Sequence, residues 1–439
     1  MASIHRRSVA ALLCGVLVLA ACGSDDSSSA DTTTSDTTSV DTTTSDSTSS
    51  TSEVELAFEL PTNEMGAADV AGLPDLTAGV AADPTNLGAG ETPGFLYGVW
   101  DPDRGVNLAA AGLSEIDSET AMATDMSFRI GSITKTFTAT AVLLLVDDGK
   151  VDLDEPVATY TGDLTSALPG GDTATVRSVL GMMSGWPEYS NNPEGPFTQQ
   201  LAEPDREFTA EELVAAAAGE EPTSTDEVTY VNTNYVVLGE LIEQVSGTSF
   251  SDFVKTRILD PLGLENTVIP DQTVTAPTVT HGYLNDGWAD FGVENLPEDV
   301  LAVAQSGDDV TEVSTSVGGT AGNGVSTLSD LAIWAAADFG NVLLSDSSRE
   351  ARLAGNPAEN VLPTSEYGLG LQLLGDWHGH GGEIFGWESF ILANPTTGQV
   401  AVANANACCG LGGATLIAAA SAFADDPTLA ELVATLFGF

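Results

Sequence analysis

Apolar residues dominate the segment 94–100 and recur through the segment 106–112. Both segments have the composition of β-strands. Between them, Asp101-Pro102-Asp103-Arg104-Gly105 carries the residues that favour a tight turn. The pattern therefore predicts two strands joined by a short turn.

A longer apolar run extends from Ser132 to Asp148 and is followed by Gly149. Apolar residues such as Phe137 and Leu144 would lie on most sides of a helix formed by this run. Glycine just past the last apolar residue is a frequent helix stop. The run therefore predicts a central, buried helix.

The middle of the chain, about residues 150–345, has the composition of helices and loops, and the C-terminal part returns to strands. Its clearest predicted elements are helices 210–218 and 234–245, strands 367–374, 389–394 and 399–405, and a closing helix 429–437. Strands at both ends with helices between them predict a mixed fold, in which one sheet is built from both termini and a helical lobe is inserted.

The first 22 residues have the character of a targeting signal. His5-Arg6-Arg7 form a basic start, and the apolar run 9–21 is too short to span a bilayer comfortably. The run ends in Leu19-Ala20-Ala21-Cys22, which resembles the bacterial lipobox, a signal whose cysteine is lipidated and becomes the mature N-terminus. The resemblance implies an extracytoplasmic protein anchored to the cell membrane through Cys22. A plain signal peptide that happens to contain a cysteine is the alternative.

Residues 23–53 consist almost entirely of Ser, Thr and Asp, without an aromatic or basic residue. Such a segment has too little apolar surface to offset its chain entropy, so it is expected to be a disordered tether. A flexible chain of this length has a mean reach of roughly 30 Å. The folded domain is therefore expected over residues 54–439.

The charge of the chain narrows the range of partners. It has 64 acidic and 12 basic residues, a formal net charge of −52. A surface with this charge repels the phosphates of nucleic acids, so a nucleic-acid-binding role is excluded. Adaptation to salty surroundings and a compositional habit of the genome both account for the acidity, and the sequence does not separate them.

Beyond the signal region only Cys408 and Cys409 remain. Two adjacent cysteines lack the spacing of a metal cage. A vicinal disulfide, pairing between chains and two buried thiols all remain open.

Ser132 and Lys135 place a hydroxyl and an amine three residues apart at the start of the predicted central helix. On a helix these positions share a face. Burial would lower the affinity of Lys135 for its proton, and a neutral lysine can accept the proton of a serine hydroxyl. The chain has only three lysines, and this one lies in an apolar helix. Ser132 is therefore the candidate nucleophile and Lys135 its proton acceptor, against the alternative of a capping serine and a surface lysine.

Two residues just before the predicted helix 234–245 have side chains suited to a catalytic site. Tyr230 next to a lysine can pass a proton to a leaving group, and the amide of Asn232 can both donate to and accept from a substrate amide. Taken alone, Tyr230 is better explained as an ordinary loop residue.

Another candidate is the segment His380-Gly381-Gly382-Glu383, near the edge of a C-terminal strand. Glycines in a strand often mark close approach of a ligand to the backbone. Backbone N–H groups of Ser132 and Glu383 would then form an oxyanion hole. A structural histidine is the alternative for His380, and Gly381 and Gly382 are assigned to substrate binding with Glu383.

Ser-x-x-Lys, Tyr-x-Asn and His-x-Gly in this order resemble the motifs of the penicillin-recognising serine hydrolases. The chain is most similar to the group related to class C β-lactamases, which includes D-alanyl-D-alanine carboxypeptidases, D-aminopeptidases and esterases. The resemblance extends over about residues 93–425. It implies the DD-peptidase/β-lactamase fold, of α/β (α+β) type, with an antiparallel sheet flanked by helices, an all-helical lobe, and the site between them.

The same resemblance implies a role for each motif residue. Ser132 attacks the carbonyl and Lys135 takes its proton. Tyr230 relays a proton to the leaving group, and Asn232 positions the acyl side chain. His380 replaces the lysine of the lactamase Lys-Thr-Gly motif and stabilises the tyrosine-centred network. The family mechanism needs no metal or organic cofactor.

The chain departs from the family where carboxylate recognition is expected. Gly381 stands where a carboxylate-binding threonine is common, and no Lys or Arg occurs from Ile258 to Ser348 or after Arg352. The nearby acids Glu383 and Glu388 suit an amine-bearing or neutral substrate. A cation from elsewhere in the chain, such as Arg177, Arg206 or Lys255, would supply a partner for a substrate carboxylate if it folded into the site.

The predicted function is that of a serine hydrolase, which forms an acyl-enzyme with a peptide, amide or small ester. A D-amino-acid peptide, such as one derived from the cell wall, is the favoured substrate class. A lipid-anchored penicillin-binding sensor that acylates without turnover and a class C-like β-lactamase are the alternatives, and a catalytically silent binding protein is a third. The sequence gives no oligomeric state.

Overall fold

The computed structural model describes residues 54–73, 80–88, 90–192, 194–286, 304–408 and 413–437. The chain divides into two units, residues 1–52 and 53–439, and every described residue belongs to the second. The signal, Cys22 and the whole of the tether predicted from sequence lie outside the described residues. Within the described ranges, none of the helices has the length and apolar character needed to cross a bilayer.

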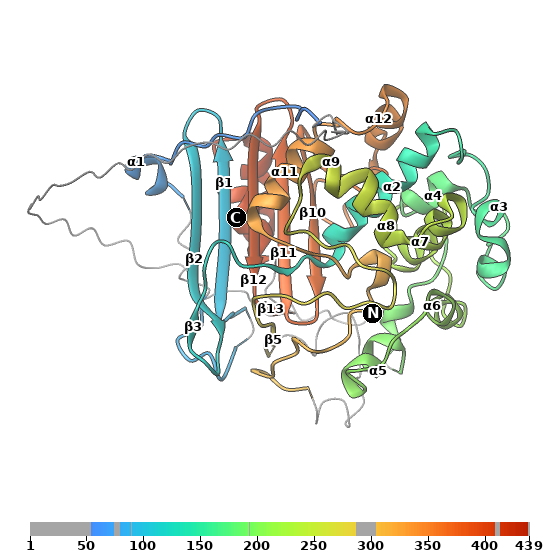
Figure 1. The fold of residues 1–439 in the computed structure, drawn as a ribbon, viewed down its shortest axis with the longest axis horizontal. Helices are drawn as coiled ribbons and strands as arrows, with labels where there is room; N and C mark the ends of the chain where they lie inside the picture. Colours follow the sequence, from blue (N-terminus) through green and yellow to red (C-terminus); the bar gives the residue numbers. More distant parts are fainter. Residues whose placement is uncertain are drawn as a thin grey trace, which may run out of the picture. The chain divides into compact units, whose positions relative to one another are not determined.

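A sheet of nine strands, counted over the described residues, forms the centre of the fold in the order β3-β2-β1-β12-β11-β10-β9-β8-β7 (Figure 1). The N-terminal strand β1 (Gly94–Asp101) pairs on one side with β2 (Gly105–Glu115) and on the other with β12 (Gln399–Ala405). All pairs in this sheet are antiparallel. The predicted sheet made from both ends of the chain is confirmed.

The remaining strands are short, apart from two long ones near the site. The large sheet also contains β3 (Thr120–Ala121), β7 (Asn356–Pro357), β8 (Glu366–Tyr367), β9 (Gln372–Leu374), β10 (Trp377–Ile384) and β11 (Trp387–Asn394). Two small sheets pair β4 (Phe128–Arg129) with β6 (Val325–Ser326), and β5 (Tyr283–Leu284) with β13 (Ala407–Cys408).

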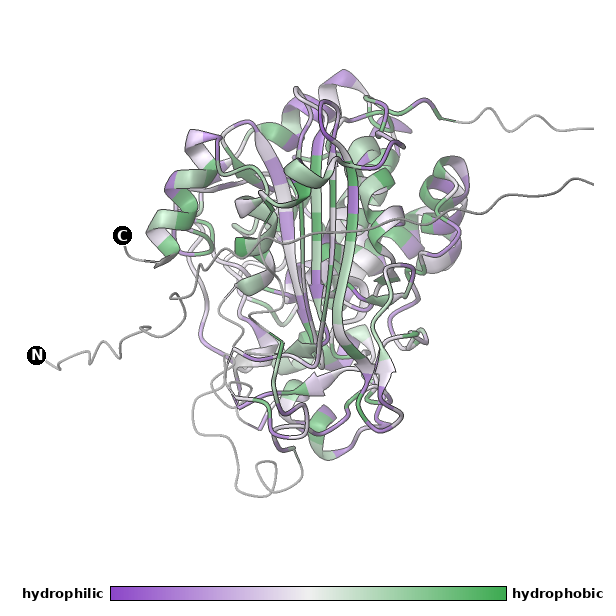
Figure 2. Ribbon diagram, turned by 90° about the vertical axis from the view of Figure 1, so that its left-hand side faces the viewer, coloured by the Kyte–Doolittle hydropathy of each residue, from purple (hydrophilic) through white to green (hydrophobic). Residues whose placement is uncertain are grey.

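In the middle of the large sheet both faces are buried, because helices cover each of them. All eight residues of β1 are buried, and their side chains alternate between two apolar clusters. Leu96 packs on the side covered by α11 (Leu328–Asp338), whereas Tyr97 packs on the side of α13 (Ala414–Ser421) and α14 (Pro427–Phe437). Figure 2 shows the strands running between these two sets of helices.

The helical lobe lies beside the β10 side of the sheet (Figure 1). Its helices are α3 (Ala158–Thr161), α4 (Val176–Leu180), α5 (Pro196–Ala202), α6 (Ala210–Ala217), α7 (Thr233–Ser246), α8 (Phe250–Val254) and α9 (Asp260–Leu262). Shorter turns are η3 (Gly162–Thr165), η4 (Tyr189–Asn191), η7 (Gly319–Ala321) and the π-turn η5 (Lys255–Leu259), and two peripheral helices are α1 (Ala67–Val70) and α12 (Asp346–Leu353).

The two lobe helices predicted most clearly from sequence are present, and local chemistry sets their ends. At the start of α6, Thr209 and Glu212 form a reciprocal capping box. At the end of α7, Gly247 adopts φ 73°, a left-handed conformation that glycine enters without strain.

The central helix α2 (Thr134–Asp147) is buried from Thr134 to Leu145, as its apolar pattern predicted. It packs against the sheet-covering helix α11, where Phe137 stacks on Trp334 with ring centroids 3.9 Å apart. The sequence placed Ser132 in this helix, but Ser132 lies in a preceding 3₁₀ turn, η2 (Gly131–Ile133). Gly131, with φ 51°, turns the backbone just before the helix.

The C-terminal strands differ in two places from the sequence prediction. The predicted strand 367–374 is a tight hairpin of β8 and β9, because Gly370 turns the chain with φ 75°. The strand β10 was not predicted as a range, since Gly379, Gly381 and Gly382 lower its strand propensity. In addition, α11 falls within the range expected for the helical lobe but packs on the sheet.

Cys408 is buried in β13 and is disulfide-bonded, which excludes a free thiol at this position. Cys409 lies outside the described residues.

Candidate active site

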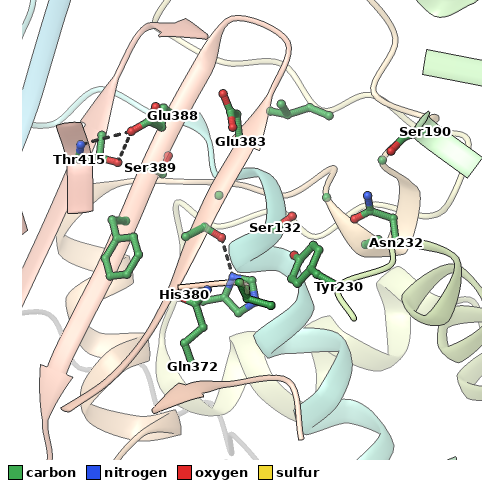
Figure 3. A pocket seen from close by; sticks show the side chains of 18 of the residues that line it. Ser132, Ser190, Tyr230, Asn232, Gln372, His380, Glu383, Glu388, Ser389 and Thr415 are labelled. Carbon is green, nitrogen blue, oxygen red and sulfur yellow. Dashed lines mark hydrogen bonds between the residues drawn. The ribbon is translucent and has the colours of Figure 1, made fainter. Parts of the chain in front are cut away.

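A cavity of about 500 Å³ lies between β10 and the helical lobe. The sequence-predicted residues that line it are Ser132, Tyr230, Asn232, His380, Gly381, Gly382 and Glu383 (Figure 3). Lys135 is fully buried directly behind Ser132. The structure therefore brings together every predicted site residue except Cys22, which lies outside the described residues.

The amine of Lys135 is held by three oxygen atoms. Its Nζ lies 2.8 Å from Ser132 Oγ, 2.7 Å from Asn232 Oδ1 and 2.9 Å from the carbonyl oxygen of Ala321. The side-chain and backbone carbonyl oxygens of Asn232 and Ala321 can only accept hydrogen bonds. A neutral amine therefore gives its two N–H groups to these oxygens and turns its lone pair to the Ser132 hydroxyl.

Burial lowers the pKa of Lys135 to about 7, although the carboxylate of Glu188 acts in the opposite direction. The ring of Tyr230 lies 4.8 Å from Nζ and the side chain is otherwise enclosed. At neutral pH a substantial fraction of Lys135 is therefore uncharged.

Two glycines allow the Ser132 turn to touch strand β10. A Cβ atom on Gly131 would lie 2.4 Å from the backbone nitrogen of Glu383, and one on Gly382 would lie 1.8 Å from the carbonyl oxygen of Ile130. Only glycine fits at both positions. The resulting contact places the backbone that leads into Ser132 directly against the backbone of Glu383.

The hydroxyl of Tyr230 is buried, points toward Ser132 and has no hydrogen-bond partner of normal geometry within the described part of the chain (Figure 3). Burial raises the pKa of Tyr230 far above its ordinary value, while Ser132 acts to lower it. Tyr230 is therefore protonated at neutral pH, with its hydroxyl directed toward Ser132.

His380 is buried and both of its ring nitrogens are engaged. Nδ1 lies 2.6 Å from the carbonyl oxygen of Gly381, which can only accept, so Nδ1 carries the hydrogen. Nε2 then accepts from the hydroxyl of Tyr367 at 3.1 Å. Burial, assisted by the nearby Lys135, lowers the pKa of His380 to about 3. The histidine is thus neutral, and it differs in charge from the lysine that it replaces in the resemblance.

Glu188 lines the cavity and was missed by the sequence reasoning. Its carboxylate is buried and accepts hydrogen bonds from the backbone N–H groups of Asn232 and, at 3.0 Å, Ser190. Burial raises the pKa of Glu188, whereas these hydrogen bonds and Lys135 lower it. Nothing in the sequence singles out this residue, because its position depends on a loop that precedes Asn232 by more than forty residues.

The described residues that line the cavity include the acids Glu188, Glu383 and Glu388 and no Arg or Lys. The three cations left open by the sequence lie elsewhere: Arg177 pairs with Asp154, Arg206 lies near Glu212, and Lys255 pairs with Asp260. Over the described ranges, no cluster of His, Cys, Asp or Glu is arranged to hold a metal ion.

An antiparallel sheet joined to a helical lobe, with a serine beside a buried lysine at their junction, defines a serine hydrolase of the penicillin-recognising class. The model of the Beta-lactamase family matches residues 77–423, and the chain belongs to this family. The resemblance seen in the motifs is confirmed, and so is the predicted fold class.

Solved structures with the same fold include two amide-cleaving enzymes by name. A D-stereospecific amidohydrolase from a Streptomyces species is 30% identical, with a TM-score of 0.60, and the match covers 72% of this chain and 90% of that one. D-amino acid amidase from Ochrobactrum anthropi SV3 is 28% identical, with a TM-score of 0.61, over 73% of this chain and 88% of that one.

Among curated proteins, penicillin-binding protein 4* of Bacillus subtilis strain 168 is 26% identical over 59% of this chain and 55% of its own length. The chain spans about half the length of the first curated relatives that it matches. The roles of the individual site residues remain predictions.

Proposed function

We propose that this protein is a serine amidase that forms an acyl-enzyme at Ser132 with substrates carrying a free amine on the acyl part, such as D-amino acid amides or short D-peptides. The observation that carries the proposal is the buried Lys135 amine, 2.8 Å from Ser132 Oγ and with two carbonyl oxygens as its other partners. This arrangement supplies a base to a serine hydroxyl that is open to the cavity.

In the proposed first half-reaction, Ser132 Oγ forms a bond to the amide carbon and its proton passes to Lys135. Backbone N–H groups of Ser132 and Glu383 stabilise the negative oxygen of the tetrahedral intermediate. As the C–N bond breaks, Tyr230 donates its proton to the departing nitrogen and regains one from Lys135. Water then cleaves the ester by the same proton path in reverse, which restores Ser132 and releases the acid.

Three features support an amine on the acyl part of the substrate. Glu188 accepts a hydrogen bond from the backbone N–H of Asn232, and Asn232 is expected to hold the acyl group. The described lining of the cavity has no cation for a substrate carboxylate, which argues against carboxypeptidase and penicillinase activity. Of the two structural relatives, one is named as a D-stereospecific amidohydrolase and the other as a D-amino acid amidase.

We expect Glu188→Gln to raise KM for D-phenylalanine amide about tenfold, because it removes the carboxylate that faces the substrate amine. The des-amino analogue 3-phenylpropanamide should show no comparable change in KM. The same variant loses a charge that raises the pKa of Lys135, so the acid limb of its pH–rate profile should move to lower pH. Glu227→Gln, at an exposed position in the same part of the lobe, is the matched control. Equal effects on both substrates would rule out a role for Glu188 in amine recognition.

Two curated relatives are named as penicillin-binding proteins, and this favours a second candidate function. In that function the protein is acylated by penicillin without turnover. It uses the same residues, so only kinetics separate the two. We expect steady release of D-phenylalanine from its amide. A stoichiometric burst of labelling by a fluorescent penicillin, without turnover of any amide or ester, would instead support the second candidate.

We also propose that the chain is a lipoprotein, anchored to the extracytoplasmic face of the membrane through Cys22. When the full chain is produced in bacteria, the mature protein should partition into the detergent phase of Triton X-114, because a lipid anchor adds apolar surface. Cys22→Ala should partition into the aqueous phase, and Cys14→Ala, within the same leader, serves as the control. Aqueous partitioning of the wild type would disprove the anchor.

A further inference from the structure

Two glutamates lie directly opposite each other on the hairpin of β10 and β11, at one end of the cavity. Glu383 and Glu388 are direct cross-strand partners and both line the cavity. Side chains at directly opposite positions on antiparallel strands have Cβ atoms about 4.5–5.5 Å apart. In Figure 3 this pair lies on one side of Ser132, and Asn232 and Ser190 lie on the other. If Asn232 holds the acyl group, the pair lies on the leaving-group side.

The two carboxyl groups have unequal surroundings. Glu388 is buried, and its Oε1 accepts hydrogen bonds from the hydroxyl of Thr415 at 2.8 Å and from its backbone N–H at 3.3 Å, at the start of α13. Burial raises the pKa of Glu388, whereas the hydrogen bonds from Thr415 and the positive end of the helix act in the opposite direction. The side-chain carboxyl group of Glu383 receives no hydrogen bond from any described residue. Its burial, together with Glu388, raises its pKa well above the ordinary value. Glu383 thus lacks a positive partner.

A separate residue on the same side of the cavity also lacks a hydrogen-bond donor. Gln372 is 7% exposed and lines the cavity, and its side-chain Oε1 has no partner within the described ranges. Gln372 pairs with Gly379, which shares a strand face with Gly381 and Glu383. Gly379 and Glu383 are four residue steps apart along the strand, a distance of about 13 Å. This face therefore presents acceptors at both ends.

The floor between these acceptors is open. Gly381 has no side chain, and a Cβ there would only reach van der Waals contact with Phe390 at 3.4 Å. No Arg or Lys among the described residues lines this part of the cavity. A leaving group with a carboxylate would thus meet two acids, whereas one with an ammonium or several N–H groups would find acceptors.

We propose that Glu383 and Glu388 form a leaving-group subsite for an ammonium group, so that the preferred substrates are amides whose departing amine carries a second amino group. This inference rests on the proposed amidase function. Hydrolysis cleaves the amide C–N bond, water supplies a hydroxyl to the acyl carbon and a hydrogen to the departing nitrogen, and the second ammonium remains unchanged. The product is a diamine, or a residue with an amino side chain.

The test compares two amides with the same acyl group, D-phenylalanine 4-aminobutylamide and D-phenylalanine butylamide. We expect the wild type to favour the aminobutylamide in kcat/KM by at least about tenfold, and Glu383→Gln to remove most of this preference. The ratio cancels any loss that the variant imposes on both substrates. Glu366→Gln, which removes an exposed carboxylate from β8 of the same sheet, should keep the wild-type ratio. A wild-type ratio near one, or an unchanged ratio in Glu383→Gln, would overturn the proposal.

A charge reversal and a binding measurement complete the test. Glu383→Lys should invert the preference, in favour of an amide whose departing amine is 4-aminobutanoate. Titration calorimetry with 1,5-diaminopentane should show binding to the wild type and not to Glu383→Gln. If neither amide is cleaved but the diamine binds in this manner, the amidase function fails and the subsite stands. If the amides are cleaved without preference and the diamine does not bind, the subsite fails and the amidase function stands.

Discussion

Replacing Ser132 by alanine should reduce the hydrolysis of D-phenylalanine amide by about 10³-fold or more, because no acyl-enzyme can form without its hydroxyl. The variant should also lose covalent labelling by a fluorophosphonate probe. Both effects are measured on the full chain, by steady-state kinetics and by mass spectrometry of the labelled protein. The substitution removes one oxygen from a half-buried position, so the fold should be retained.

Ser190 provides the matched control, since it lines the same cavity as Ser132. Its backbone N–H, which donates a hydrogen bond to Glu188, remains in Ser190→Ala. The control variant should still be labelled by the probe. Unchanged turnover in Ser132→Ala would end the assignment of Ser132 as the nucleophile.

Replacing Lys135 by methionine should have the second-largest effect, a loss of about 10²–10⁴-fold in kcat/KM at neutral pH. The wild type should also lose activity as the pH falls through about 7, because protonation of Lys135 removes the lone pair that accepts the Ser132 proton. Burial disfavours the charged form of Lys135, so the pH at which activity is lost lies far below the ordinary range of a lysine pKa. The residual activity of the variant should lack this limb.

Lys255 is the appropriate control, because it is exposed and pairs with Asp260 at the surface. Lys255→Met should keep both the rate and the pH profile of the wild type. A limb near pH 7 that persists in Lys135→Met would show that another group controls the reaction.

The reactive pair was accessible to sequence reasoning, because spacing along one helix is a local property. Ser132 and Lys135 meet across a 3₁₀ turn rather than within a regular helix, yet three residues still separate them on one side of the backbone. The scarcity of lysine in the chain made the pair conspicuous. Tyr230, Asn232 and His380 needed the family resemblance, since no local pattern connects them to Ser132.

What the sequence left out depends on tertiary contacts. The Glu188 side chain is held in the cavity by the backbone N–H groups of Asn232 and Ser190. The hydrogen bond from Tyr367 to His380 forms because Gly370 breaks the predicted strand into a hairpin. The orphan amide of Gln372 likewise appears only once β9 has paired with β10. Each of these depends on chain segments whose proximity no local periodicity encodes.

The pairing of β1 with β12 has a consequence for biosynthesis. Trp100 lies directly opposite Val400 on the neighbouring strand, so the middle of the sheet joins strands from the first and last thirds of the chain. A ribosome must therefore complete nearly the whole polypeptide before this strand finds its neighbour. Until then the apolar residues of β1 have one open edge, a state prone to aggregation. A nascent chain of this kind depends on being kept unfolded until its C-terminal strands emerge.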